Sequence, residues 1–327
     1  MADARRRPSD RRAELSQPMS ADEPPGDRAP SGEQYVIAHG SSQAQITQVG
    51  ATLRGYTVDG RDVIDGFGRD ERASDGRGQV LAPWPNRLTD GSYEYGGRQC
   101  QAPLNEPSRH DAIHGLVRWS DWWLVAHRPA SVTMSYVLRP QPGYEWQLDL
   151  ELTYELDDAG LTVTLRARNL DRERAPFGVG FHPYLRLGAS AIDDLELTVP
   201  SARTLDPERE AMVPVAGTPQ DFTQPRRIGS TQLDTAFGEL VRGEAGRAVA
   251  TLSDSRGDRA VHLWVDSGYR YLMVYTADRV GDTERRRKAV AVEPMSCPPD
   301  ALRSGTDLIE LDPGRSWQAS WGLRPQL

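Results

Sequence analysis

The residues of this chain best suited to proton-transfer chemistry are two histidines, a glutamate and an asparagine–arginine pair. His182 lies in segment 176–185, where Pro183 holds it extended and Phe181 and Tyr184 flank it. A rigidly aimed imidazole is suited to acid–base catalysis, but a buried structural histidine at a strand end would give the same pattern. This segment alone leaves both interpretations open.

Glu293 is the carboxylate whose sequence surroundings best fit a general base. It follows the apolar run 289–292 and precedes Pro294. A carboxyl at the rim of a buried sheet is partly desolvated, which raises its pKa toward the range of a useful general base. A solvated glutamate at a strand end is the alternative, although the four apolar residues before it argue against full exposure.

The other polar candidates are expected in loops. His114 precedes Gly115, which lets another group approach the backbone closely. Asn86 and Arg87 follow a loop fixed by two prolines, and they offer amide and guanidinium donors to hydroxyl or carboxyl oxygens. A surface turn with Trp84 in the core would also explain that loop.

The segments expected to position these residues have the sequence pattern of β-strands. Residues 147–156 alternate apolar and polar side chains, a turn follows at 157–160, and 161–168 alternate again, which predicts a long β-hairpin with one buried face. Similar short runs recur at 131–138, 195–199, 261–265, 271–276, 289–292 and 316–323. No long segment has a helical period. We therefore predict an all-β protein, a single large antiparallel β-sandwich with few or no helices.

Composition limits the classes of function. The chain has 327 residues and is 38% hydrophobic with 8 Trp and 11 Tyr, enough for one large core. Its net charge of −8 argues against nucleic acid or an anionic membrane surface as a partner. Cys100 and Cys297 have no metal or redox spacing, so no metal site is predicted.

The N-terminal region differs from the rest of the chain. Residues 1–32 are rich in Arg, Asp, Pro and Ser, which predicts a disordered tail before one domain at 33–327. The tail has no apolar segment of the kind found in secretory signals, and no apolar run is long enough to span a bilayer. We expect a soluble, cytoplasmic protein, either monomer or dimer.

Taken in order, these motifs resemble those of the aldose 1-epimerase (galactose mutarotase) family. The resemblance rests on residues 86–87 with Gly91, Tyr93 and 96–97, and on 113–115, 182–184, 233–237 and 292–295; the match ends at the turn 312–314. No single motif is specific, but five of them in the family's order and approximate spacing are. The resemblance covers nearly the whole chain after the tail and implies the galactose mutarotase-like supersandwich fold.

The resemblance also implies an activity. Family members interconvert the α and β anomers of a free hexose such as glucose or galactose through the open-chain aldehyde, without metal or organic cofactor. Glu293 is implied to be the base on the C1 hydroxyl, His182 the acid on the ring oxygen, and His114 a third catalytic residue that stabilises developing charge. An acid near neutral pH should be protonated at rest, so we expect a charged His182 favoured by a nearby carboxylate.

The same resemblance assigns sugar-binding residues. They are Arg87, Asn86, Asp234 and Tyr184. Asp234 is the least certain match, because Thr235 follows it where many members have a histidine. Leu116 and Leu185 also depart from the residues common in the family, which leaves the preferred sugar open.

Three alternatives remain. Branches of the same fold act on hexose 6-phosphates, and Arg118, close behind His114, is the candidate to bind a phosphate. A non-catalytic carbohydrate-binding or regulatory protein could keep the same pocket, although the presence of both His182 and Glu293 favours an enzyme. A lyase or hydrolase on a similar sandwich would need a second catalytic carboxylate or a tyrosine.

Overall fold

The structure is a computed structural model that describes residues 29–327 apart from 189–190, 210 and 244. Most of the predicted tail, residues 1–28, therefore lies outside the described residues. Ser31, near the predicted boundary, is buried, and its carbonyl accepts a hydrogen bond from the Val49 amide at 3.0 Å.

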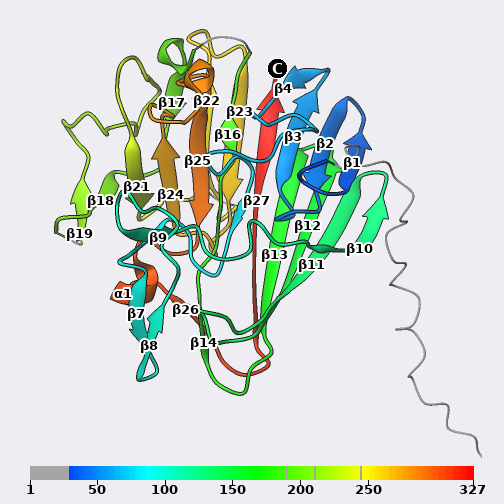
Figure 1. Ribbon diagram of the computed structural model, residues 1–327. Coiled ribbons are helices and arrows are strands. Elements are labelled where there is room, and N and C mark those ends of the chain that lie inside the picture. Colours follow the sequence, from blue (N-terminus) through cyan, green and yellow to red (C-terminus); the bar gives the residue numbers. More distant parts are fainter. Residues whose placement is uncertain (1–28, 189–190, 210, 244) are drawn as a thin grey trace, which may run out of the picture.

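Antiparallel strands make up nearly all of the regular structure (Figure 1). In chain order they are β1 (Gln34–His39), β2 (Ser42–Thr47), β3 (Leu53–Val58), β4 (Arg61–Asp62), β5 (Val80–Leu81), β6 (Arg87–Thr89), β7 (Ser92–Tyr95), β8 (Arg98–Gln101), β9 (Asp111–Ile113), β10 (Trp123–Arg128), β11 (Ser131–Leu138), β12 (Leu148–Asp157), β13 (Gly160–Asn169), β14 (Ala175–Phe177), β15 (Gly180–Phe181), β16 (Tyr184–Leu185), β17 (Glu196–Thr198), β18 (Arg203–Asp206), β19 (Ala211–Pro214), β20 (Arg226–Arg227), β21 (Asp234–Gly238), β22 (Ala248–Ser253), β23 (Ala260–Val265), β24 (Tyr271–Tyr275), β25 (Val290–Met295), β26 (Ile309–Leu311) and β27 (Ser316–Gln326).

Helices are few among the described residues, as predicted. They are the 3-10 turns η1 (Ile192–Asp194) and η2 (Thr283–Arg285) and the short helix α1 (Ala301–Ser304). No helix in the described part of the chain is long and apolar enough to cross a membrane. The prediction of an all-β fold with few or no helices is confirmed.

The predicted hairpin forms the middle of a nine-stranded sheet. β12 pairs with β13 in a continuous antiparallel register that closes at Asp157 and Gly160. The sheet order is β10-β11-β12-β13-β27-β23-β22-β17-β20. Inward residues such as Leu152 and Leu165 are fully buried, because alternate side chains of a strand point to the same face.

A second large sheet carries the candidate residues. Its order is β19-β18-β21-β24-β25-β15-β5, and β16 also pairs with β25. Figure 1 shows β25 and β27, one from each large sheet, near the middle of the molecule. Val274 and Val292 join one continuous core with Trp321 of the nine-stranded sheet, so the alternate residues Met273 and Glu293 point to the other face of the second sheet.

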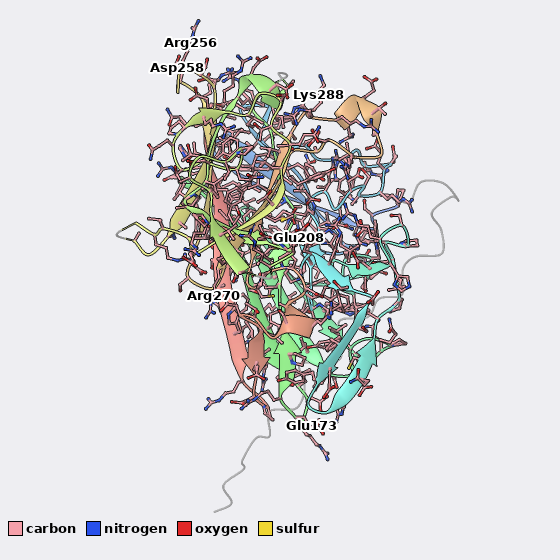
Figure 2. The ribbon with its side chains drawn as sticks, turned by 90° about the vertical axis from the view of Figure 1, so that its left-hand side faces the viewer. Glu173, Glu208, Arg256, Asp258, Arg270 and Lys288 are labelled. Atoms are coloured by element: carbon pink, nitrogen blue, oxygen red, sulfur yellow. The ribbon has the colours of Figure 1, made fainter. Side chains whose placement is uncertain are left out.

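The register of this sheet aligns the candidate residues. Gly180 of β15 pairs with Met295, and Tyr184 of β16 pairs with Ala291. The same register sets His182, which lies between those strands, opposite Glu293. Charged side chains elsewhere project outward; Figure 2 shows Arg256 and Asp258 at one end of the molecule and Glu173 at the other.

Candidate active site

His182 and Glu293 face each other across a break in the strand that accompanies β25. The histidine and Pro183 separate β15 from β16, and the Pro183 carbonyl accepts a hydrogen bond from the Val292 amide at 3.2 Å. The His182 Nε2 lies 3.2 Å from the Glu293 Oε1. Their side chains are only 6% and 3% exposed, so the two groups form a buried pair.

Glu293 is more deeply buried than the sequence suggests. It lies inside the central strand β25 rather than at a strand end. Burial raises the pKa of its carboxyl well above the ordinary value; the charge of Asp234 raises it further, and Arg87 opposes the shift. Its Oε2 is buried and has no hydrogen-bond partner among the described residues, so the carboxyl has one unsatisfied oxygen.

The expectation that His182 is charged at rest is wrong. Burial lowers the pKa of its imidazole to about 3, and the charges of Arg77 and Arg118 act in the same direction. With the Glu293 pKa raised, the proton of the pair resides on the carboxyl, since a neutral acid and a neutral imidazole cost less to bury than two charges. The carboxylate that was expected to favour the imidazolium is itself neutralised.

A glycine-containing loop that the sequence analysis did not single out encloses His182. The His182 carbonyl accepts from the Gly78 amide at 2.9 Å, and the His182 amide donates to the Gln79 carbonyl at 3.1 Å. A Cβ on Gly76, whose φ is +80°, would lie 2.5 Å from the His182 Cδ2. Only glycine fits so close to the ring in this conformation, which explains the sequence Asp-Gly-Arg-Gly at 75–78.

Tyr184 lies behind His182. The Tyr184 ring stacks on the His182 imidazole with centroids 4.9 Å apart. The Arg77 guanidinium covers the other face of the Tyr184 ring, with its Cζ 4.7 Å from the ring centroid. The Tyr184 hydroxyl donates to the Asp75 carbonyl at 2.9 Å. Both ring faces and the hydroxyl of Tyr184 are therefore in contact with protein groups, so Tyr184 supports His182, and its expected substrate-binding role stays a prediction. Phe181 points into the core against Trp321.

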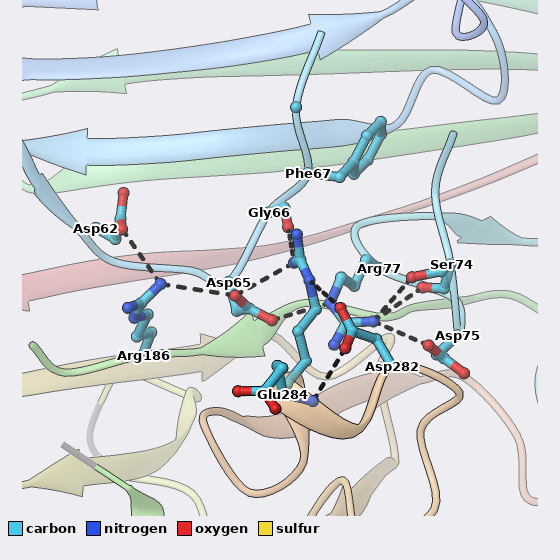
Figure 3. A network of polar contacts seen from close by, with 12 residues as sticks. Asp62, Asp65, Gly66, Phe67, Ser74, Asp75, Arg77, Arg186, Asp282 and Glu284 are labelled. Atoms are coloured by element: carbon cyan, nitrogen blue, oxygen red, sulfur yellow. Dashed lines mark hydrogen bonds and ion pairs between the residues drawn. The ribbon is translucent and has the colours of Figure 1, made fainter. Parts of the chain in front are cut away.

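Arg77 ties this support to a buried ionic network (Figure 3). Its side chain is fully buried, and its Nε donates to the Asp65 Oδ2 at 2.9 Å. Nη1 reaches the Asp75 Oδ2 at 3.1 Å, while Arg186 and Arg285 approach the other oxygen of Asp65 at 3.7 and 3.5 Å. The cluster of arginines and aspartates thus holds Arg77 in place on the side of the Tyr184 ring away from His182.

His114 reaches the pair from a different direction. Strands β6 and β9 pair Arg87 with Ile113, and the His114 amide then donates to the Asn86 carbonyl at 2.9 Å. The His114 ring meets the His182 ring edge to face, with centroids 5.4 Å apart. Burial lowers the pKa of His114 well below its ordinary value, so this imidazole is also neutral. A Cβ on the next residue, Gly115, would lie 2.1 Å from the Ala82 carbonyl oxygen.

The remaining predicted residues border an open cavity. Arg87 is held by two hydrogen bonds to Glu106, at 2.7 and 3.1 Å, and its Nη1 lies 3.8 Å from Asp234. Arg87, Asn86 and Asp234 line a cavity of about 660 Å³. Met273, also in the lining, pairs with Glu293, so the His182–Glu293 pair adjoins this cavity.

The fold thus gathers all the predicted site residues into one region, six around the pair and its cavity and Tyr184 behind. Among the described residues, no group of three or more His, Cys, Asp or Glu side chains could hold a metal ion.

Comparison with known proteins places the chain in a family. The family model described as aldose 1-epimerase matches residues 33–324. This chain belongs to the aldose 1-epimerase family. The uncharacterized protein YihR of Escherichia coli K12 is 32% identical over 290 residues, which cover 87% of this chain and 91% of YihR.

A characterised relative and a solved structure are also similar to this chain. Galactose mutarotase of Homo sapiens is 28% identical over 225 residues, 61% of this chain and 64% of that protein. The crystal structure of a GalM/aldose epimerase homologue from C. elegans superposes with a TM-score of 0.78 at 18% identity, covering 90% of this chain and 98% of the other. The predicted family and its fold are confirmed.

The lowered pKa of His182 predicts how stability depends on pH. Between the ordinary histidine pKa and about 3, the unfolded chain binds a proton at His182 that the folded site refuses, so the contribution of His182 to the free energy of unfolding falls as pH drops, while the raised pKa of Glu293 contributes in the opposite direction. His182→Asn removes the histidine contribution, so the stability of this variant relative to the wild type should rise by about 2 kcal/mol between about pH 7 and about pH 5. Urea unfolding of both proteins at the two pH values measures this difference, and an unchanged difference would contradict the neutral imidazole.

The buried network predicts a stability effect at Arg77. Arg77→Met removes the guanidinium from Asp65 and Asp75 and should cost roughly 3 kcal/mol of unfolding free energy, because the removal leaves buried carboxylate charge less compensated. The exposed Arg61→Met is the control and should change stability by less than about 0.5 kcal/mol. Equal stability of the two variants in urea unfolding would show that Arg77 is not structurally required.

Proposed function

We propose that this protein is a mutarotase that interconverts the anomers of a free hexose such as glucose or galactose. The observation that carries this proposal is the buried pair, whose His182 Nε2 and Glu293 Oε1 are 3.2 Å apart. The ring oxygen and the anomeric hydroxyl of an aldose are bonded to the same carbon. Two protein atoms this close can therefore serve both oxygens at once, one as acid and one as base.

The pair has one proton to transfer. During the reaction it donates one proton and accepts another, so it takes up no proton overall. In the ionised form, the Glu293 carboxylate takes the proton from the C1 hydroxyl while the His182 imidazolium protonates the ring oxygen. The bond between C1 and the ring oxygen breaks, the aldehyde forms, rotation about C1–C2 exposes its other face, and the reverse transfers close the ring. The ionised form arises from the resting one by proton transfer within the pair, and Arg87 favours the carboxylate.

The neighbouring residues orient the sugar and stabilise developing charge. His114, neutral and with its Nδ1 unpartnered among the described residues, donates a hydrogen bond beside the ring oxygen. Arg87, Asn86 and Asp234 bind ring hydroxyls from the cavity wall. Tyr184 and the Arg77 guanidinium keep the His182 ring from turning away from the sugar.

A hexose-6-phosphate mutarotase is the second candidate, and one observation supports it. Arg118 is half-buried, and its Nε has no hydrogen-bond partner in the described part of the chain. Its charge lowers the pKa of both His114 and His182, which places it close to the pair. If phosphate is the recognised group, Arg118→Ala should reduce turnover of glucose 6-phosphate much more than turnover of glucose, and equal losses on both substrates would refute the phosphate role.

Polarimetry on freshly dissolved α-D-glucose and α-D-galactose tests the function. The protein should accelerate at least one of the two mutarotations, and Glu293→Gln and His182→Asn should each lower kcat by about 10²–10⁴-fold while sugar binding survives. His262→Asn, which changes a half-buried histidine in the other large sheet, is the matched control and should retain wild-type turnover.

The outcomes separate the hypotheses. If the protein leaves the spontaneous mutarotation rates of both free sugars unchanged, the free-hexose proposal is refuted and glucose 6-phosphate becomes the next substrate to test. Binding without turnover of any of these sugars would favour a carbohydrate-binding protein. Wild-type rates in either site variant would refute the assigned acid and base.

A further inference from the structure

We infer that Glu106 is a positioning residue of this site: it holds the Arg87 guanidinium by one edge and leaves the Nη1 donors to bind a sugar hydroxyl. This inference rests on the proposed mutarotase function, in which Arg87 binds the sugar and favours the Glu293 carboxylate. Glu106 lies in the loop between β8 and β9, outside every motif that the sequence analysis singled out.

Glu106 binds Arg87 with both carboxylate oxygens. The Arg87 Nε donates to the Glu106 Oε2 at 2.7 Å, and Nη2 donates to Oε1 at 3.1 Å. Two parallel bonds fix the plane of a guanidinium as well as its position, which a single bond does not. Nη1 takes no part in these bonds and lies 3.8 Å from Asp234, beyond hydrogen-bond distance. Both Arg87 and Asp234 line the cavity, so the two bonds leave Nη1 on the cavity side.

Backbone pairing holds Glu106 beside Arg87. Strand β9 pairs with β6 along one edge, and along its other edge Asp111 exchanges backbone hydrogen bonds of 3.0 and 3.3 Å with Glu106. The Asn105 side chain exchanges two more with the Ile113 backbone, at 2.7 and 3.0 Å. Ile113 pairs with Arg87 and lies two residues from Asp111, so the register sets the Arg87 and Glu106 side chains on one face of this small sheet.

Other carboxylates compete for the same guanidinium. The Asp111 Oδ2 lies 4.0 Å from the Arg87 Nε, and Asp234 lies 3.8 Å from Nη1. Without Glu106, the guanidinium would turn toward one of these carboxylates, and its donors would bind protein rather than sugar. Glu293 would then lose part of the positive charge that opposes the rise of its pKa. Glu106 therefore acts on the sugar and on Glu293 through Arg87.

Glu106→Gln tests this role, because glutamine keeps the length of the side chain but can accept through only one oxygen. We expect kcat/KM for glucose or galactose to fall about tenfold or more, mainly through a higher KM, since one charge-assisted bond and the fixed plane are lost. In an Arg87→Met background, the same substitution should change kcat/KM by less than about twofold, because no guanidinium remains to be positioned.

A matched control and a spectroscopic measurement separate positioning from a general structural effect. Glu173→Gln alters an exposed carboxylate that accepts from Arg98 at 2.6 Å, and it should retain wild-type kinetics. Nitrogen-15 NMR of arginine-labelled protein, assigned with Arg87→Met, follows the Arg87 Nε–H directly. Its signal should be protected from solvent exchange in the wild type and in Glu173→Gln, and it should lose that protection in Glu106→Gln.

The outcomes distinguish failure of this inference from failure of the function. Wild-type turnover in Glu106→Gln, equal losses with and without Arg87, or a protected Arg87 Nε–H in Glu106→Gln each overturn the positioning role alone. If neither free sugar nor glucose 6-phosphate is turned over, the mutarotase proposal fails. The positioning role then stands only if Glu106→Gln weakens the binding of one of these sugars in calorimetry, and unchanged or absent binding overturns it.

Discussion

The site depends on one feature of strand register. β25 pairs with β15 on one side of His182–Pro183 and with β16 on the other, which leaves His182 opposite Glu293 where the partner strand is interrupted. Pro183 has no amide hydrogen to complete a regular ladder there. The sheet therefore brings an imidazole and a carboxyl into contact without placing either on a mobile loop. A one-residue shift of the β15–β16 segment relative to β25 would place His182 on the opposite face of the sheet from Glu293 and abolish the pair.

Burial then decides the charge state of that pair. Both side chains are almost fully removed from water, which raises the pKa of Glu293 and lowers that of His182. The pair is neutral at rest yet remains one short proton transfer from the ionised form. The Arg77 guanidinium, stacked behind Tyr184, further disfavours a resting imidazolium. Under the proposed function, a bound sugar together with Arg87 supplies the polar surroundings in which the charges can separate.

Sequence patterns predicted the sheet and most of the residues that the fold gathers at the candidate site. Period-two alternation gave the β12–β13 hairpin because each strand has one buried face, and the family's motifs pointed to His114, His182, Glu293, Asn86, Arg87 and Asp234. The resting charge of His182 was wrong because the depth of burial depends on both sheets. The roles of Gly76 and Arg77 were missed, since contacts with His182 and Tyr184 across more than 100 residues leave no local pattern. The Asp-Gly-Arg-Gly run was the one signal available.

The most direct test of the central claim is the protonation of His182 in the folded protein. Nitrogen-15 NMR of histidine-labelled protein, assigned with His182→Asn, reports whether each ring is neutral or an imidazolium. We expect a neutral His182 in the sugar-free protein at neutral pH and at about pH 5, well above its lowered pKa. An imidazolium signal for His182 at neutral pH in the sugar-free protein would contradict it.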